Sequence, residues 1–220
     1  MAAWSRRARR RLLTFVFVVV VALVILLFRL VEDIGLEKGP DDRFVVVRVL
    51  DGDTMELRGG DKVRLLAIDT PEKGEPLHDE ATRLLSRLAF NQGATLEYAN
   101  QRRDRYGRLL GYVYVDTLFL NKTIIDSGYA YVYLFNDNEL TSPSVKKLLD
   151  AQRSAIDRRA GLWSLSFTPE TRYINTEGSF RLHRPGCRSL RELKPGRFQE
   201  FRTREEGLVL GLSPCRNCKP

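Results

Sequence analysis

The chain has 220 residues, a formal net charge of +8, 43% hydrophobic residues and 10% aromatic residues, and this apolar content excludes a disordered chain. The excess positive charge lies at the two ends: residues 32–165 hold 19 Lys and Arg against 22 Asp and Glu, whereas residues 166–220 hold 11 against 6, so net charge alone does not predict a nucleic-acid-binding protein. The three cysteines all follow residue 186, which excludes a disulfide-stabilised main domain.

The first 31 residues combine a basic arm with an apolar run. Arginines stand at positions 6, 7, 9, 10 and 11, and residues 12–28 carry no charge. About 20 apolar residues cross a bilayer core, and Arg29 at the end of the run can reach the headgroups. We predict a single transmembrane helix with the arginines in the cytoplasm and the rest of the chain outside it, periplasmic or at the cell surface. The alternative is a cleaved signal peptide, although the run is long and lacks a small-residue cleavage site.

Residues 32–43 are charged, contain two glycines and a proline, and are predicted to be a linker. Five strands are then predicted from runs of β-branched and apolar residues, at 44–50, 54–57, 62–68, 94–98 and 109–115. Helical periodicity predicts three helices at 78–90, 118–127 and 144–159. This order predicts an α+β domain over residues 44–165, a closed five-stranded barrel of the OB type with three helices packed against it.

Acidic residues cluster at predicted strand ends and turns. Asp51 and Asp53 flank a turn glycine, Asp69 ends the strand at 62–68, and Glu72 follows three residues later. Carboxylates from neighbouring strands are the ligands that Ca²⁺ prefers. Each segment taken alone is also consistent with an ordinary hairpin turn or loop.

Arginines favour a functional interpretation of these acids. Arg64 lies within an otherwise apolar strand and needs an anionic partner there. Residues 104–108, with Arg105 and Arg108, form a compact basic loop, and arginine binds phosphate as a bidentate fork. Carboxylates for a metal, arginines for a phosphoryl group and a glutamate for a water are the parts of metal-assisted phosphodiester hydrolysis.

Five segments together resemble the signature segments of staphylococcal-type thermonucleases. These are residues 49–54, 63–72, 104–108, 128–133 and 161–164. The resemblance covers about residues 44–165 and implies an OB-type barrel and a Ca²⁺-dependent phosphodiesterase that acts on DNA and RNA. The loop at residues 73–78 is shorter than the resemblance implies.

The resemblance also implies a role for each matching residue. Arg64, Glu72 and Arg108 would be catalytic, Asp53, Asp69 and the Thr70 carbonyl would bind Ca²⁺ with Asp51 behind them, and Arg105, Tyr106, Tyr131 and Tyr133 would bind substrate. In the last group, Tyr131 and Tyr133 would lie beside a nucleobase; packing at the barrel edge is the alternative.

The tail, residues 166–220, contains a set of soft metal ligands. These are His183, Cys187, Cys215 and Cys218. Four such ligands predict a structural Zn²⁺ site, and a segment this small gains stability from a metal. The tail resembles the zinc-binding domain of Ada-type repair proteins, with His183 in place of one cysteine. A disulfide is the alternative. Because four protein ligands leave no open position on the metal, loss of Cys215 is expected to unfold the tail and spare the cleavage of short substrates.

The leading prediction is therefore a membrane-anchored, Ca²⁺-dependent nuclease with a small zinc module, acting on single-stranded DNA or RNA. The alternative is a non-catalytic module on the same fold that binds nucleic acid or protein. An envelope assembly protein is a third possibility.

Overall fold

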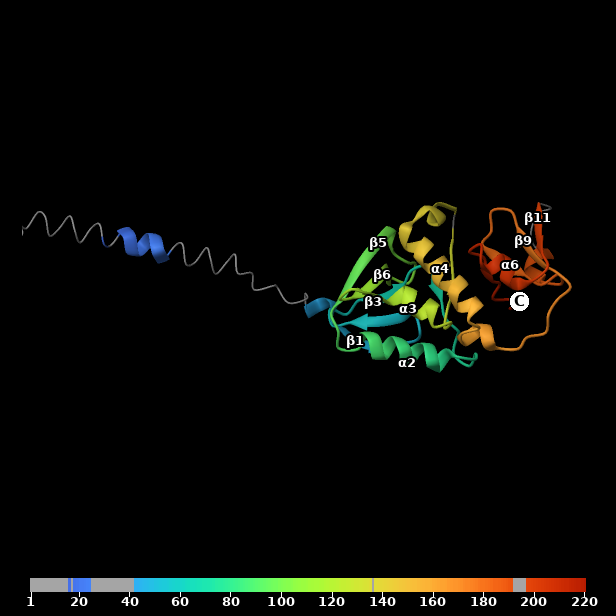
Figure 1. The fold of residues 1–220 in the computed structure, drawn as a ribbon, viewed down its shortest axis with the longest axis horizontal. Helices are drawn as coiled ribbons and strands as arrows, with labels where there is room; N and C mark the ends of the chain where they lie inside the picture. Colours follow the sequence, from blue (N-terminus) through green and yellow to red (C-terminus); the bar gives the residue numbers. More distant parts are fainter. Residues whose placement is uncertain (1–15, 17, 25–41, 136, 192–196) are drawn as a thin grey trace, which may run out of the picture. The chain divides into compact units, whose positions relative to one another are not determined.

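The computed structural model describes residues 16, 18–24, 42–135, 137–191 and 197–220 (Figure 1). By internal contacts the chain divides into two compact units, Met1–Gly39 and Pro40–Pro220.

The first unit corrects the predicted membrane anchor. Residues 16 and 18–24 are helical and exposed. Within the described part of the chain, no helix is long and apolar enough to cross a membrane. The predicted localisation, a single-pass anchor with the remaining chain outside the cytoplasm, is therefore wrong; the other residues of the predicted anchor lie outside the described ranges.

The second unit is built on a sheet of six strands, in which five form a continuous path and β7 pairs with β6. The path runs β1 (Val46–Val49), β2 (Thr54–Leu57), β3 (Lys62–Leu65), β6 (Leu109–Val115) and β5 (Ala94–Arg103), and β7 is Leu118–Phe119. A separate two-stranded ladder pairs β4 (Ile68–Asp69) with β8 (Tyr131–Val132). The single strand predicted at 62–68 is divided into β3 and β4, because Ala67 adopts a φ of 59° that no strand accommodates.

The closed barrel that we predicted is not formed by the described strands. Strands β1 and β5 lie at the two ends of the path, and among the described residues they do not pair with each other; Val45 and Gly93, just before the two strands, form an isolated bridge. The α+β class is confirmed, and the sheet remains open at this seam.

Three α-helices accompany the sheet, as predicted. They are α2 (His78–Ala89), α3 (Leu120–Asp126) and α4 (Pro143–Asp157). The short 3₁₀ segments η1 (Asp42–Phe44), η2 (Asp137–Thr141) and η3 (Gly161–Ser164) complete this part of the chain. Helices α3 and α4 end where Gly128 and Gly161, both with positive φ, approach each other; a Cβ on Gly128 would lie 2.1 Å from the carbonyl oxygen of Ala160. The glycines thus allow the two helix ends to meet.

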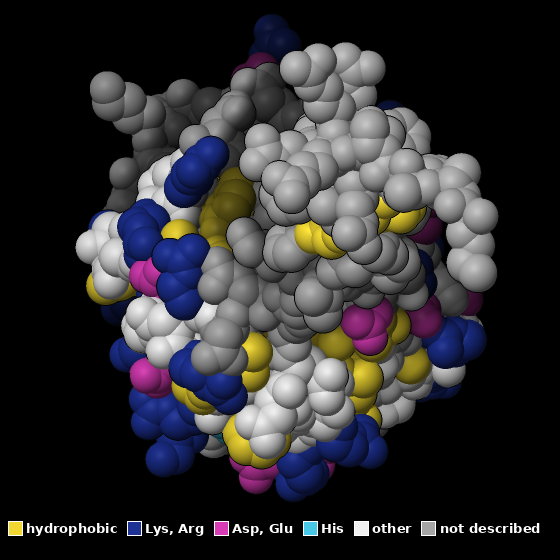
Figure 2. Space-filling model, turned by 90° about the vertical axis from the view of Figure 1, so that its left-hand side faces the viewer, with side chains coloured by type: hydrophobic (Ala, Val, Ile, Leu, Met, Phe, Trp, Pro, Cys, Tyr) yellow, Lys and Arg dark blue, Asp and Glu magenta, His cyan; other side chains and the backbone are white. Residues whose placement is uncertain are grey.

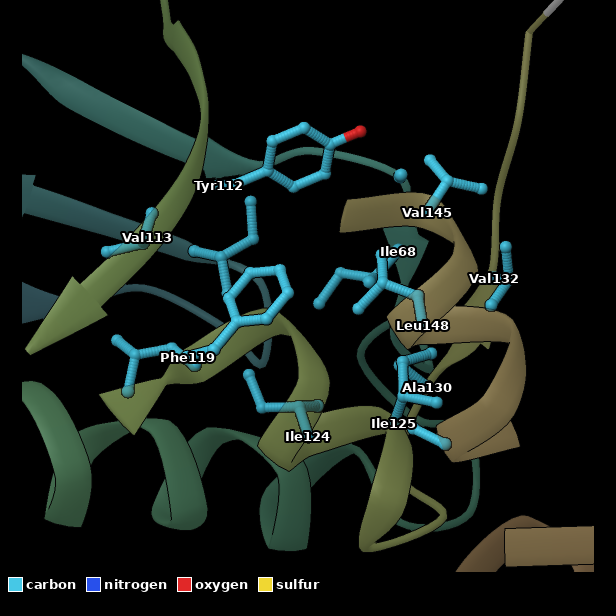
Figure 3. Packing of buried hydrophobic residues seen from close by; sticks show 14 of the residues in the cluster. Ile68, Tyr112, Val113, Phe119, Ile124, Ile125, Ala130, Val132, Val145 and Leu148 are labelled. Atoms are coloured by element: carbon cyan, nitrogen blue, oxygen red, sulfur yellow. The ribbon is translucent and has the colours of Figure 1, made fainter. Parts of the chain in front are cut away.

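The hydrophobic core lies between the sheet and helices α3 and α4. Figure 3 shows Tyr112 and Phe119 from the sheet facing Ile124 of α3 and Leu148 of α4. Burying each such side chain stabilises the fold by roughly 1.5–3 kcal/mol. This core holds the strands that carry the acidic turn and Arg64.

The tail forms a second small sheet, drawn in orange and red in Figure 1. Its strands are β9 (Tyr173–Thr176), β10 (Arg181–His183), β11 (Phe198–Phe201) and β12 (Ser213–Pro214), in the order β11-β9-β10-β12, with α5 (Arg188–Arg191) and α6 (Arg204–Leu208). Several of its buried residues, including Leu182 and Leu208, belong to the same hydrophobic cluster as those of the main sheet. The two parts therefore share a core.

Charged side chains are dispersed on the face shown in Figure 2, where Lys and Arg alternate with acidic and apolar side chains. In the described part of this face, side chains of both charges are present.

Candidate active site

The turn at residues 51–53 places a carboxylate inside the protein. Asp53 is only 6% exposed and accepts hydrogen bonds from the backbone N–H and the hydroxyl of Thr70, each at 3.0 Å. A Cβ on Gly52 would lie 2.6 Å from Cβ of Ala81 on α2, so the turn packs this closely only because residue 52 is glycine. These contacts fix the turn against the end of β4.

Arg64 joins the two carboxylates predicted to bind metal. Its Nε lies 3.0 Å from Oδ1 of Asp53, and its Nη2 lies 3.2 Å from Oδ1 of Asp69. The guanidinium also donates to the backbone carbonyls of Leu65 and Ile68. With a side chain 14% exposed, Arg64 is held in a fixed position between strands β3 and β4.

Negative charge is crowded at this point. Burial raises the pKa of Asp69, against the opposing effect of its arginine partners, and burial together with the charge of Asp53 raises the pKa of Asp51. A divalent cation would relieve this crowding, and carboxylate oxygens are the donors that Ca²⁺ takes. Asp53 and Asp69 therefore fit a hard cation. The N–H and hydroxyl of Thr70 are used by Asp53, and its carbonyl remains the predicted ligand.

Glu72, the predicted general base, lies in the loop after β4 with a side chain that is 69% exposed. Its backbone N–H donates to Oε2 of Glu75 at 2.8 Å, which shapes the loop. Its carboxylate is therefore accessible to water.

The basic loop at residues 104–108 is organised by Asp104. Its carboxylate accepts from the backbone N–H of Tyr106 and Arg108 at 2.9 and 3.0 Å, and from Nε of Arg108 at 2.8 Å. The Arg105 guanidinium stacks on the exposed Tyr106 ring, with Cζ 4.8 Å from the centroid. This cluster stands at the start of β6, which pairs in parallel with β3 and so runs beside Arg64.

Asp104→Asn should lower the free energy of unfolding by about 1–2 kcal/mol at pH 7, because Arg108 would lose a charged hydrogen-bond partner. Burial raises the pKa of Asp104, but the hydrogen bonds from Arg108 and Tyr106 outweigh it and set that pKa below its usual value. The stabilisation is thus complete above the unfolded pKa of about 3.9 and is lost as the pH falls through the folded pKa.

Urea denaturation of the Asn variant and the parent chain at pH 7 and at acidic pH checks this result. Asp61→Asn is the control, because Asp61 is 43% exposed and pairs with Arg103 at the surface, where pairs contribute about 0–1 kcal/mol. An Asp104 effect of the same size at both pH values would contradict the argument.

The two tyrosines predicted to contact a base are largely covered. Tyr131 packs edge-on against Trp163, with centroids 5.4 Å apart, and burial raises the pKa of its phenol. On Tyr133, the guanidinium of Arg181 lies 3.6 Å from the ring centroid. These contacts favour the alternative, in which Tyr131 and Tyr133 pack against the protein and not against a nucleobase. Tyr106, by contrast, is exposed.

The four predicted zinc ligands converge in the tail. One potential ligand atom from each of His183, Cys187, Cys215 and Cys218 lies within 4.8 Å of the others. Among the described residues, buried Nδ1 of His183 has no hydrogen-bond partner. Burial and the charge of Arg181 lower the pKa of this histidine, which favours the neutral form that binds metal. The three cysteines are free. The residues therefore fit Zn²⁺.

One further residue at the acidic cluster, Arg216, was not predicted from any sequence pattern. Arg216, between Cys215 and Cys218, places Nη2 2.7 Å from Oδ1 of Asp69 and 3.7 Å from Oε1 of Glu72. A basic residue in a small zinc module is normally interpreted as an exposed charge. Its position in the sequence alone would therefore not have identified Arg216 as part of the acidic cluster.

Oxygen donors beside fixed arginines are the arrangement of a metal-assisted phosphodiesterase. Comparison with known proteins agrees. Residues 62–165 match the family described as staphylococcal nuclease homologue. An uncharacterised endonuclease of Escherichia coli O157:H7 is 38% identical over 123 residues, which cover 54% of this chain and 75% of that protein. The chain therefore belongs to the staphylococcal nuclease family.

Two other relatives support this membership. A micrococcal nuclease of Shigella flexneri is 32% identical over 136 residues, covering 56% of this chain and 75% of the relative. A thermonuclease of Staphylococcus hyicus is 28% identical over 170 residues, covering 70% and 99%. The predicted family and enzyme class, a phosphodiesterase of the thermonuclease type, are confirmed. The family match ends at residue 165, so the resemblance of the tail to an Ada-type domain stays a prediction.

Proposed function

We propose that the chain is a Ca²⁺-dependent nuclease that hydrolyses phosphodiester bonds in DNA or RNA. The observation that carries this proposal is the single Arg64 guanidinium between the carboxylates of Asp53 and Asp69. Both carboxylates would hold the cation next to the phosphate bound by Arg64, and the family membership supports the same chemistry.

Asp53, Asp69 and the Thr70 carbonyl would hold the cation, with Asp51 behind them. When bound, Ca²⁺ would supply positive charge to a phosphoryl oxygen and so favour attack at phosphorus. The protein residues do the remaining work. Arg64, fixed by two backbone carbonyls, would bind a non-bridging oxygen of the scissile phosphate.

Glu72 would accept a proton from the attacking water, whose oxygen forms a new bond to phosphorus. The ester bond to the leaving sugar oxygen would break with its electron pair, and that oxygen would take up a proton from solvent water to become a hydroxyl. Arg108 would stabilise the negative charge that develops there. Arg105 and exposed Tyr106 would bind a neighbouring phosphate, a role that suits a flexible single strand.

The proposal for the tail is a structural Zn²⁺ ion held by His183, Cys187, Cys215 and Cys218. The unpartnered Nδ1 of buried His183 supports it, since a buried polar atom without a partner is costly. Four protein ligands leave no position for a water on this ion. Zinc would therefore organise the tail and take no part in hydrolysis.

Digestion of single-stranded DNA and RNA by the purified protein tests the nuclease proposal. Cleavage should proceed with Ca²⁺, stop in an excess of chelator that removes Ca²⁺, and return when Ca²⁺ is restored. Full activity without any divalent ion would disprove the mechanism, and the absence of cleavage with Ca²⁺ would disprove the function.

A further inference from the structure

The tail reaches the acidic cluster with a short segment, residues 215–219, which we call the knuckle. Arg216 of the knuckle pairs with Asp69 and lies near Glu72. Lys219 pairs with Glu75 in the loop that carries Glu72. Two basic residues of the predicted zinc module thus contact three acids on one side of the candidate active site.

Buried contacts hold the knuckle in this position. Gln152 of α4 is completely buried, accepts from the N–H of Val132 in β8 at 2.8 Å, and donates to the carbonyl of Leu208 at 2.6 Å. Arg181 donates to the carbonyl of Leu134 and to the hydroxyl of Ser213, each at 2.9 Å. The strand just before the knuckle is therefore tied to the main domain by hydrogen bonds in the interior.

A stacked arginine adds a second attachment. Arg204 is 5% exposed and its Cζ lies 4.1 Å from the ring centroid of Phe167 and 5.5 Å from that of Trp163. A Cβ on Gly211 would be in contact with side chains of Leu134 and Leu149, so this part of the tail lies directly on the main core. The docking of the tail is consequently specific, and Arg216 is presented at a defined place.

The two arginines on Asp69 differ in how firmly they are held. Arg64 is 14% exposed and anchored by two backbone carbonyls. Arg216 has a side chain that is 58% exposed, and its other neighbours are the carboxylate of Glu72 and the ring of Tyr133, 5.6 Å from Cζ. A cation bound to Asp69 would repel both guanidinium groups, and Arg216 is the one with open solvent to turn into.

We propose that Arg216 is a substrate-binding residue that the tail contributes to the nuclease site. Without metal it neutralises Asp69; with Ca²⁺ bound it turns from Asp69 to a phosphate of the nucleic acid strand beside the scissile bond. The inference rests on the proposed nuclease function and extends the substrate-binding surface from residues 44–165 to the tail. Arginine suits this role because it stays charged and binds phosphate through two N–H groups.

The test compares Arg216→Ala, Arg216→Gln and Arg202→Ala. Arg202 is an exposed arginine of the same tail and lines a different hollow, together with Arg172 and Glu200. Zinc content and far-UV circular dichroism are measured for each variant, and the Gln variant retains a long polar side chain in case the Ala variant loses its fold. Steady-state cleavage of a short single-stranded oligodeoxynucleotide gives kcat and KM, and calorimetry without DNA gives the Ca²⁺ affinity.

Both Arg216 variants should raise KM by about tenfold or more, the effect of losing one charge-assisted hydrogen bond, while kcat changes little. Their Ca²⁺ affinity should increase severalfold, because a positive charge next to Asp69 has been removed. Arg202→Ala should match the parent chain in both measurements.

Two results would overturn the inference while leaving the nuclease proposal intact. In the first, the parent chain cleaves DNA and the Arg216 variants match Arg202→Ala in KM and Ca²⁺ affinity. In the second, the Arg216 variants cleave DNA more efficiently than the parent chain, which would make the contact inhibitory. Failure of the parent chain itself to cleave DNA with Ca²⁺ would instead refute the proposed function.

Discussion

Arg64→Ala should reduce kcat by about 10²–10³-fold, the usual loss when a preorganised donor to the developing charge is removed. Without Ca²⁺ it should also lower the free energy of unfolding by about 3 kcal/mol, the lower end for a broken buried ion pair, because Asp53 would lose its guanidinium partner while Asp69 would keep Arg216. Added Ca²⁺ should recover much of this stability, since it would bind the same carboxylates, and should recover none of the rate. Thermal unfolding with and without Ca²⁺, together with single-turnover cleavage, measures both effects.

Arg48→Ala is the matched control for this variant. Arg48 lies on β1 of the same sheet, is 62% exposed, and pairs with Glu56 at the surface. Its loss should change stability by no more than about 0.5 kcal/mol and leave cleavage unchanged. An Arg64 variant with normal kcat would show that Arg64 does not stabilise the developing charge. A variant whose stability Ca²⁺ does not improve would show that Asp53 and Asp69 are not the metal ligands.

Cys215→Ser should remove zinc from the protein, from about one ion per chain to none, and unfold the tail. Structural zinc sites in small peptides contribute apparent binding energies of about 10–16 kcal/mol, and three remaining ligands cannot replace the lost thiolate. Because Arg216 is the next residue, the variant should also show the raised KM expected for Arg216→Ala, even on short substrates. This outcome differs from the expectation from sequence alone, which left cleavage by the main domain intact.

Metal analysis and peptide mapping by mass spectrometry, with and without reductant, decide this prediction. Arg188→Ala is the control, because Arg188 is exposed and adjacent to Cys187 yet offers no metal ligand. A parent chain without zinc, carrying a Cys–Cys crosslink, would show that the tail is closed by a disulfide. A normal KM in a zinc-free Cys215 variant would show that the tail does not contribute to substrate binding.

Local patterns predicted the local structure well. The periodic apolar face of residues 78–90 predicted α2, which spans His78–Ala89, because burial of one helix face is a sequence-local signal. The position of Arg64 in an apolar strand pointed to an acidic partner, and it contacts two. The break between β3 and β4 was missed, since nothing about an alanine at position 67 signals a positive φ.

Long-range contacts were beyond the reach of such patterns. Arg216 and Asp69 are 147 residues apart, and their pairing depends on how the tail docks through Gln152 and Arg204. The tail sheet was also missed, because its strands are two to four residues long and their signals are correspondingly weak. In each case the structure is determined by packing between segments that are far apart in the chain. A short stretch of sequence carries no information about that packing.

The pairing of Arg216 with Asp69 has a consequence for synthesis of the chain on the ribosome. The main domain is complete when residue 165 has been added, and Arg216 follows about fifty residues later. At roughly 5–20 residues per second, the domain has about 3–10 s in which to fold before that arginine exists. In this interval Arg64 alone compensates Asp69, and one predicted phosphate contact is missing. RNA is abundant where the chain is synthesised, and the nascent chain would bind substrate more weakly than the finished protein. This stage would end when the knuckle has been synthesised.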